Sequence, residues 1–297
     1  MILGKLGYDP PFMCAEDLDW SLGRQSSGCQ TNTNGESSRP LTAHLKVYPQ
    51  SLAFYNWFDA STLSVDCAVS SMGRRIAGVD DAGRGPVIGP LVIAGVLMDE
   101  DRVHELVSMG VKDSKLLTPR SRSDLAEKIQ EIALKIAYDE LSPAEIDEVV
   151  LRARRLQKLN FLEAKSMAKV ITDLEPSAVW VDASDVKPER YARHILDDLP
   201  ANLKRIVLVS EHKADRRYPI VSAASIMAKV RRDARISKLW EEYGNFGSGY
   251  VTDPSTIEFL KKWRGEHADY PPIVRRSWKT LREIESDLAQ TKLTARE

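Results

Sequence analysis

The clearest indication of the fold is the segment RIAGVDDAGRGPVIGPLVIAGVLM, residues 75–98. Two apolar segments in it, residues 76–79 and 91–98, have the length and the residue types of buried strands. A loop rich in glycine and proline joins them, and Asp80 and Asp81 stand where the first segment ends. We therefore expect two strands with a pair of like-charged acids beside the loop between them.

The sequence after residue 98 alternates predicted helices with predicted strands. Further strands are expected near residues 136–141, 178–181 and 205–209. Helices are expected at 101–109, 119–136, 159–174, 188–198, 219–243, 254–264 and 277–289. Strands interleaved with helices predict an α/β (α+β) domain in three layers.

Residues 1–71 have a different composition from the rest of the chain. Residues 25–40 are rich in Ser, Thr, Asn and Gly, and they show no hydrophobic period. All three cysteines, Cys14, Cys29 and Cys67, lie in this segment at a spacing that fits neither a disulfide framework nor a zinc site. The segment is either a small accessory domain or a disordered extension. We favour an extension outside the catalytic domain, because Met72 directly precedes the first convincing strand.

The overall composition is that of an ordinary globular protein. Hydrophobic residues make up 43% of the chain, charged residues 29%, and the formal net charge is -1, so a polyanion would have to bind a local basic surface. No signal peptide is visible, and the longest apolar run, residues 91–98, is too short to span a bilayer. We expect a cytoplasmic monomer without a membrane partner.

Acidic residues follow three of the predicted strands. Asp80 and Asp81 follow the first, Asp182 follows the fourth, and Asp215 comes shortly after the fifth. Carboxylates at the ends of neighbouring strands can converge, and a cation is then needed to offset their repulsion. Oxygen ligands without His or Cys suit Mg²⁺ or Mn²⁺, and two such ions can support phosphodiester hydrolysis.

A single Asp at the end of a strand is usually a turn or cap residue. Here the acid pair is followed at once by Gly83, Arg84 and Gly85, and the two glycines allow backbone N–H groups to approach a ligand closely. This combination favours a metal-dependent nuclease site over a purely structural role.

The sequence resembles type 2 ribonuclease H, most closely the single-chain archaeal form of the ribonuclease HII family. The matching blocks occur in family order: IAGVDDAGRGPVIGP (76–90), VKDSK (111–115), VDASDV (181–186), HKAD (212–215), YPIVSAAS (218–225), GSGY (247–250) and PIVRRSW (272–278). The resemblance implies a ribonuclease H-like five-stranded mixed sheet flanked by helices, spanning 72–297, with a C-terminal helical extension over about 219–290.

The resemblance also implies an activity and a set of site residues. The enzyme would hydrolyse RNA in RNA–DNA hybrids, and cut 5′ to ribonucleotides embedded in duplex DNA, by two-metal-ion catalysis that leaves a 3′-hydroxyl and a 5′-phosphate. Asp80, Asp81, Asp182 and Asp215 would bind the metal ions. Among the other matched positions, Gly83, Arg84 and Gly85 would contact the ribonucleotide 2′-hydroxyl, and Tyr250 would pack against the deoxyribose that follows it. The resemblance also favours substrate contacts by Ser222, Ser225 and Lys229 on the helix expected at 219–243. Lys115 is either a substrate phosphate ligand, a partner of a site carboxylate or a solvated surface lysine.

One site residue departs from the family pattern. Asp81 stands where the family normally carries glutamate, so its side chain is shorter by one methylene group, about 1.5 Å of reach. We expect retained activity with a stronger preference for Mn²⁺, because Mg²⁺ demands stricter geometry.

Two other interpretations stay open from the sequence. One is a hybrid-binding protein whose catalysis is weakened by the change at Asp81, and the other is type 3 ribonuclease H. Arg84, where the type 3 enzyme typically has threonine, and the acid-rich N-terminal segment count against the second. The C-terminus from Gln290 begins like a sliding-clamp-binding box but lacks the aromatic pair, so clamp binding is not expected.

Overall fold

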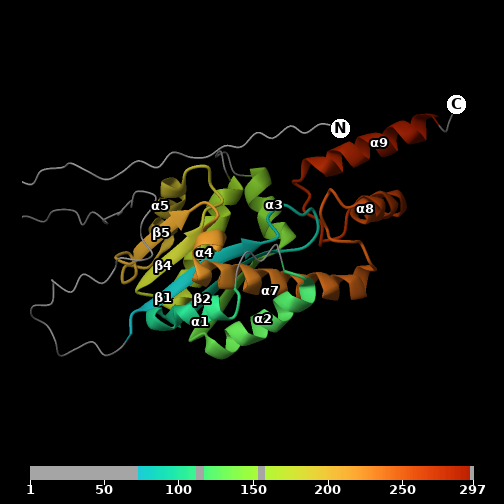
Figure 1. Ribbon diagram of the computed structural model, residues 1–297. Helices are drawn as coiled ribbons and strands as arrows, with labels where there is room; N and C mark the ends of the chain where they lie inside the picture. The colour runs from blue at the N-terminus through green and yellow to red at the C-terminus, as the bar shows by residue number, and fades with distance from the viewer. Residues whose placement is uncertain (1–72, 112–116, 153–157, 295–297) are drawn as a thin grey trace, which may run out of the picture. The chain divides into compact units, whose positions relative to one another are not determined.

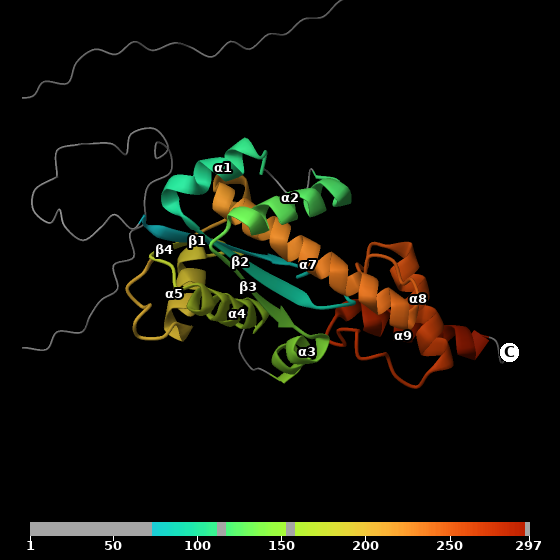
Figure 2. The same cartoon turned by 90° about the horizontal axis from the view of Figure 1, so that it is seen from below.

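The computed structural model describes residues 73–111, 117–152 and 158–294. Its centre is a five-stranded sheet in the order β3-β2-β1-β4-β5, with β1, β2, β4 and β5 labelled in Figure 1 and β3 in Figure 2. The strands are β1 (Arg75–Ala82), β2 (Leu91–Asp99), β3 (Lys135–Leu141), β4 (Ala178–Asp182) and β5 (Val207–Glu211). The β3-β2-β1 part is antiparallel, whereas β4 and β5 are parallel to β1. The expected mixed sheet is therefore confirmed.

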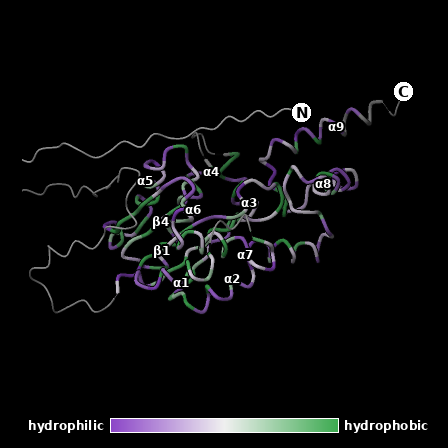
Figure 3. Tube along the Cα trace, in the orientation of Figure 1, coloured by the Kyte–Doolittle hydropathy of each residue, from purple (hydrophilic) through white to green (hydrophobic). Residues whose placement is uncertain are grey.

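Helices cover both faces of this sheet. Figure 2 shows α1 (Val103–Ser108), α2 (Pro119–Ile132) and α7 (Pro219–Tyr243) on one face, with α4 (Lys158–Leu174) and α5 (Pro188–Asp198) on the other. Each face has its own core of buried aliphatic side chains. Along α2 the trace in Figure 3 changes repeatedly between hydrophilic and hydrophobic colours, as expected of a helix with one buried side. The three-layer arrangement is thus confirmed.

The long helix α7 lies very close to the central strand. A Cβ atom placed on Gly78 of β1 would be 2.3 Å from the Ile220 carbonyl oxygen and 2.6 Å from the Val221 nitrogen. Only glycine permits this approach of the α7 backbone to β1. The approach places the first turns of α7 beside the acids of β1.

The expected C-terminal helical extension is also present. After α7 come α8 (Pro254–Glu266) and α9 (Lys279–Thr294), and a third apolar cluster joins them to residues 87 and 88 of the loop after β1. Gly89 N donates to the Ile273 carbonyl at 2.9 Å, and Arg275 N donates to the Val87 carbonyl at 2.8 Å. The glycine-rich loop and the segment before α9 are therefore held together through their backbones.

Several element boundaries differ from the sequence expectations. β1 runs on to Ala82 instead of ending at residue 79, because its antiparallel pairing with β2 continues to the pair Ala82 and Val92. β5 begins at Val207, because it pairs with β4 from that residue onward. The helix predicted at 119–136 ends at Ile132, since β3 starts at Lys135. Two helices were not expected from the sequence, α3 (Pro143–Arg152) and the short α6 (Ala214–Arg217).

Other expectations fall partly outside the described chain. Residues 1–71 and Lys115 lie among the residues that are not described. In the ranges that are described, no helix is long and apolar enough to cross a membrane.

Candidate active site

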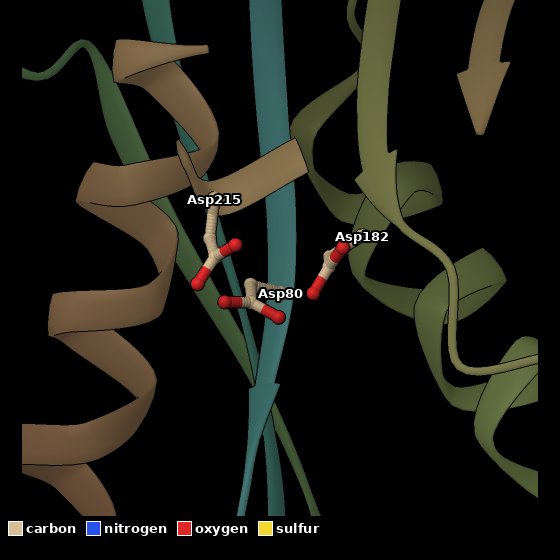
Figure 4. A group of neighbouring side chains, drawn as sticks. All are labelled: Asp80, Asp182 and Asp215. Atoms are coloured by element: carbon tan, nitrogen blue, oxygen red, sulfur yellow. The ribbon is translucent and has the colours of Figure 1, made fainter. Parts of the chain in front are cut away.

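Three acids from separate elements converge at the middle of the sheet. Asp80 comes from β1, Asp182 from the end of β4, and Asp215 from α6, which follows β5. One carboxylate oxygen of each lies within 4.8 Å of the others, and Figure 4 shows the three side chains pointing toward one another. Asp80 and Asp215 are buried, while Asp182 is partly exposed. The acids therefore form a cluster that is open to solvent through Asp182.

Local hydrogen bonds set the positions of the acids. Asp182 Oδ1 accepts from the Ala214 N–H at 2.9 Å, which fixes the start of α6 against β4. Lys213, just before α6, adopts a left-handed conformation with φ 58°, and this turns the chain so that Asp215 falls in the first turn of the helix. Ser222 of α7 donates through its hydroxyl to the Asp215 carbonyl.

The cluster is electrostatically unfavourable without a cation. Burial raises the pKa of Asp80 well above its usual value, and the nearby charges of Asp81 and Asp182 raise it further. Hydrogen bonds from the Ser225 hydroxyl and from the Asp81 N–H, the latter at 2.7 Å, act in the opposite direction. Three carboxylates in one place are the ligand set of a hard divalent cation. The residues present therefore fit a metal site.

Asp81 is not part of the three-acid group among the described residues. Its Oδ1 lies 3.4 Å from the Ser184 hydroxyl, on the side of the strand that faces Glu163 of α4. Glu163 is completely buried, and its pKa is raised well above the usual value by burial first, then by the charge of Asp81 and a hydrogen bond with it. The structure thus pairs Asp81 with an acid that the sequence analysis did not single out.

Glu163 also contacts the side chain of Arg84. Arg84 Nε lies 3.1 Å from Glu163 Oε2, the Asn160 side-chain oxygen accepts from Arg84 Nη2, and the Ser184 carbonyl accepts from Nη1 at 3.3 Å. Asn160 and Glu163 are three residues apart on α4, so they share one helix face. That spacing is the only sequence signal for this pair of contacts.

The Gly-Arg-Gly loop, Gly83 to Gly85, lies beside Tyr250. Gly83 has a φ of +91°, and a Cβ atom on it would be 2.4 Å from Arg232 Nε. A Cβ atom on Gly85 would be 3.6 Å from the Tyr250 ring, and the Arg232 guanidinium lies 5.3 Å from the centroid of the same ring. The structure therefore brings Arg84 and both glycines together with Tyr250, a residue that is 36% exposed.

The other predicted substrate residues occupy less direct positions. Ser222 and Ser225 are buried in the first turns of α7 and support Asp215 and Asp80, respectively. Lys229, further along α7, forms an ion pair with Asp233, with its Nζ 2.7 Å from Asp233 Oδ1. His212 contacts the carbonyl oxygens of Ala183 and Val186.

A sheet in the order β3-β2-β1-β4-β5, with carboxylates converging on its centre, defines a metal-dependent nuclease with a ribonuclease H-like fold. The ribonuclease HII family model matches residues 77–281. The chain belongs to the ribonuclease HII family, and it is an endonuclease that hydrolyses RNA in RNA–DNA hybrids.

Three archaeal proteins are among those similar to this chain. Ribonuclease HII of Pyrococcus abyssi is 45% identical over 220 residues, which cover 74% of this chain and 95% of that protein. The crystal structure of ribonuclease H2 from Pyrococcus horikoshii matches with a TM-score of 0.65 and 45% identity, over 72% of this chain and 98% of that one. A complex of PCNA with ribonuclease HII from Archaeoglobus fulgidus matches with a TM-score of 0.62 and 42% identity, over 70% of this chain and 96% of that chain.

Proposed function

We propose that this nuclease cuts RNA–DNA hybrids, and cuts 5′ to single ribonucleotides embedded in duplex DNA, leaving a 3′-hydroxyl and a 5′-phosphate. Asp80, Asp81, Asp182 and Asp215 are the proposed metal-binding residues. The observation that carries this proposal is the convergence of three of these carboxylates within 4.8 Å, at the strand that leads directly into the Gly-Arg-Gly loop.

Asp80, Asp182 and Asp215 would hold Mg²⁺ or Mn²⁺, and Asp81, which lies beside Ser184 and Glu163, would join them from outside the group. When bound, two such ions supply Lewis-acid stabilisation of the attacking and leaving oxygens of a phosphodiester. The chain's own contribution is to fix the carboxylates: the Ala214 N–H holds Asp182, and the Ser225 hydroxyl holds Asp80. Pre-positioned ligands keep the geometry that Mg²⁺ in particular requires.

The Gly-Arg-Gly loop would read the 2′-hydroxyl of the ribonucleotide through its backbone, and Tyr250 would pack against the deoxyribose that follows. The 2′-hydroxyl is the group that distinguishes RNA from DNA at such a site. The small distance between the Tyr250 ring and the Cβ position of Gly85, 3.6 Å, supports a shared role at adjacent nucleotides. Lys115 and Lys229 would contact phosphates, and Ser222 and Ser225 would act through the acids that they support.

The proposed partners are nucleic acids. Duplexes that contain ribonucleotides are the expected substrates, and a monomer is sufficient because every proposed ligand lies in one chain. The C-terminal box that begins at Gln290 lacks the aromatic pair that would fill a clamp pocket. We therefore do not expect tight binding to a sliding clamp, although a similar enzyme was solved in complex with PCNA.

A duplex with one embedded ribonucleotide tests this proposal. The wild-type protein should cut it with Mg²⁺ or Mn²⁺, and Asp182→Asn should reduce the rate by roughly a thousandfold because a metal-binding charge is lost. Asparagine retains an oxygen for the Ala214 N–H, so the fold should persist. Asp198→Asn, at an exposed acid near the end of α5, is the matched control and should cut at the wild-type rate.

The position of the cut and the binding of the uncut duplex distinguish a nuclease from a protein that only binds hybrids. Mapping the cut on a sequencing gel should place it 5′ to the ribonucleotide. Binding without cleavage in both metals would instead support a hybrid-binding protein that has lost its catalytic activity.

A further inference from the structure

Two side chains from the segment before α9 bind all three backbone carbonyls of the Gly-Arg-Gly loop. Arg275 Nη2 donates to the Gly83 carbonyl at 2.6 Å, and Arg275 Nη1 donates to the Arg84 carbonyl at 3.0 Å. Trp278 Nε1 donates to the Gly85 carbonyl at 2.9 Å. One short segment of chain therefore fixes three successive peptide units.

The Arg275 side chain is itself held firmly. It is completely buried, its Nε donates to the Gly89 carbonyl at 3.0 Å, and its guanidinium lies 4.9 Å from the centroid of the Trp278 ring. Burial, and then the nearby charge of Arg232, lowers the pKa of Arg275 to about 9. Burying a charged guanidinium is unfavourable, and here three carbonyl oxygens and an aromatic face stabilise the charge.

The segment that carries both residues is also anchored to α3. Asp147 of α3 accepts from the Arg276 N–H at 2.7 Å and from the Ser277 N–H at 2.9 Å. Together with the backbone pairing of Arg275 and Val87, this leaves the segment little freedom to move relative to the loop. The backbone that carries Arg275 and Trp278 is therefore held in a fixed position.

Peptide geometry converts these carbonyl contacts into an orientation of N–H groups. In a trans peptide unit the C=O and the N–H point in opposite directions, and the described residues contain no cis peptide bond. The Gly83 carbonyl points toward Arg275, so the Arg84 N–H of the same peptide unit points away from Arg275. The Arg84 carbonyl also points toward Arg275, so the Gly85 N–H points away from it. The Gly85 carbonyl precedes Pro86, which has no N–H, so Trp278 fixes the end of the loop.

We propose that Arg275 and Trp278 are positioning residues that set the preference for a ribonucleotide by orienting the Arg84 and Gly85 N–H groups toward its 2′-hydroxyl. This inference rests on the proposed function, in which the Gly-Arg-Gly loop reads that hydroxyl. Their side-chain hydrogen bonds go to the backbone carbonyls of Gly83, Arg84, Gly85 and Gly89, so they act on substrate selection through the loop.

Trp278→Phe is the central test, because phenylalanine keeps an aromatic ring under Arg275 and removes the donor to the Gly85 carbonyl. The ring also becomes smaller where Trp278 packs against two apolar clusters, and the control variant carries the same change in ring size. The measurements, on the full chain, are kcat and KM for a duplex with one ribonucleotide, and the Ki of the same duplex with deoxyribose at that position. We expect kcat/KM to fall roughly tenfold, since a hydrogen bond that orients the loop is lost. The Ki for the all-DNA duplex should stay within about twofold of the wild type, because phosphate contacts position the duplex.

Trp263→Phe is the matched control for this variant. Trp263 Nε1 also donates to a backbone carbonyl, that of Asp269 at 3.1 Å, in the same C-terminal part of the chain but away from the loop. It should leave both kcat/KM and Ki at their wild-type values. A merely structural role for Trp278 would lower the melting temperature without separating these two quantities.

Arg275→Lys provides the stronger perturbation, because lysine places all its donors on one nitrogen and loses the planar guanidinium whose Nε, Nη1 and Nη2 each bind a different carbonyl. We expect a fall in kcat/KM of roughly a hundredfold as the loop loses its fixed orientation. Arg264→Lys, at an arginine that donates to the His267 carbonyl at 3.0 Å, is its control. If Arg275→Lys does not fold, as judged by circular dichroism, Trp278→Phe alone decides the question.

The outcomes separate this inference from the proposed function. If the wild-type protein does not cut the single-ribonucleotide duplex, the proposed function fails. If the wild type cuts it, and folded Trp278→Phe cuts it with the same kcat/KM, the positioning role is overturned. An equal loss in kcat/KM and in affinity for the all-DNA duplex would overturn it as well.

Discussion

Gly83 and Gly85 differ in what an added methyl group would meet. At Gly83 the methyl would be 2.4 Å from Arg232 Nε and 2.7 Å from the Pro90 carbonyl oxygen, on a backbone with φ +91°. At Gly85 it would only touch the exposed Tyr250 ring, at an ordinary distance of 3.6 Å. The two glycines of one loop therefore serve different purposes, close packing at Gly83 and open space for a ligand at Gly85.

Alanine substitutions should separate these purposes. We expect Gly83→Ala to lower the free energy of unfolding by roughly 2 kcal/mol or more, because the residue is strained and has no space. Gly85→Ala should change stability by less than about 0.5 kcal/mol and should still reduce cleavage at least about tenfold, since its methyl group occupies the proposed ribose site. Urea unfolding and cleavage assays measure the two effects. Equal losses of stability in the two variants would contradict this distinction.

Asp81 is the residue at which a single methylene group should change metal use. Its carboxylate lies next to Ser184 and Glu163, outside the three-acid group among the described residues. Asp81→Glu adds about 1.5 Å of reach, so the carboxylate can move toward the other three acids. We expect the ratio of Mg²⁺-supported to Mn²⁺-supported cleavage to rise in this variant.

The ratio of Mg²⁺-supported to Mn²⁺-supported cleavage needs a control variant with the same Asp→Glu change away from the site. Asp198→Glu at the exposed end of α5 adds the same methylene group far from the site and should leave the ratio unchanged. If Asp81→Glu also left the ratio unchanged, the expectation for Asp81 would be wrong.

Most of the acidic site could be predicted from the sequence, whereas Glu163 could not. Asp80, Asp182 and Asp215 each follow an apolar segment that reads as a strand, so their convergence follows from strand geometry. Glu163 sits in the middle of a helix, where a charged residue usually faces solvent. Its complete burial depends on Arg84, Ser184 and Asp81 meeting it from other elements, and no local pattern encodes that meeting.

At the scale of elements, α3 was missed although its sequence carries a start signal. Ser142 and Glu145 form a reciprocal cap: Glu145 Oε2 accepts from the Ser142 N–H at 2.8 Å, and Ser142 Oγ accepts from the Glu145 N–H at 3.3 Å. This is the Ser-x-x-Glu arrangement with proline at the first helical position. The four-residue α6, by contrast, is too short to show any hydrophobic period.

The boundary of β5 shows how pairing overrides local pattern. The strand was expected at 205–209 and lies two residues later, at Val207–Glu211, in register with β4. Side chains alternate between the two faces along a strand, so moving the ends of the strand by two residues does not change the face on which any of its side chains lies. The layer arrangement was therefore predicted correctly despite the shifted boundary.

The start of α5 should make stability depend on pH in acid. Burial alone would raise the pKa of Asp185, but its hydrogen bonds with Arg190 and with the Lys187 N–H lower it from 3.8 to about 2. A lowered folded-state pKa contributes stability that is complete above pH 3.8 and is lost as the pH falls toward 2. The contribution is at most about 2.5 kcal/mol.

Unfolding measurements across this range can isolate the contribution of Asp185. The difference in free energy of unfolding between the wild type and Asp185→Asn should shrink as the pH is lowered from about 5 to about 2. Asp198→Asn, at an acid near the other end of α5 that is exposed, should show a small difference that does not vary in this way. A constant difference for Asp185→Asn would contradict the assigned pKa.

At the scale of the whole molecule, the catalytic domain should be independent of residues 1–71. The family match spans residues 77–281, and the first described strand begins at Arg75. We predict that a protein starting at Met72 has the melting temperature and the cleavage rate of the full chain. Differential scanning calorimetry and the single-ribonucleotide assay would measure both. A loss in either would show that the N-terminal segment contributes to the fold or to the substrate site.

The contacts between Arg275 and the loop join residues 192 positions apart in the sequence. During synthesis on the ribosome, the Gly-Arg-Gly loop emerges long before the segment that orients it. A nascent chain that has formed its central sheet therefore still lacks the contacts that complete its substrate site. The nuclease becomes selective only when almost the entire chain has been translated, and prematurely terminated products would not acquire the selectivity of the finished enzyme.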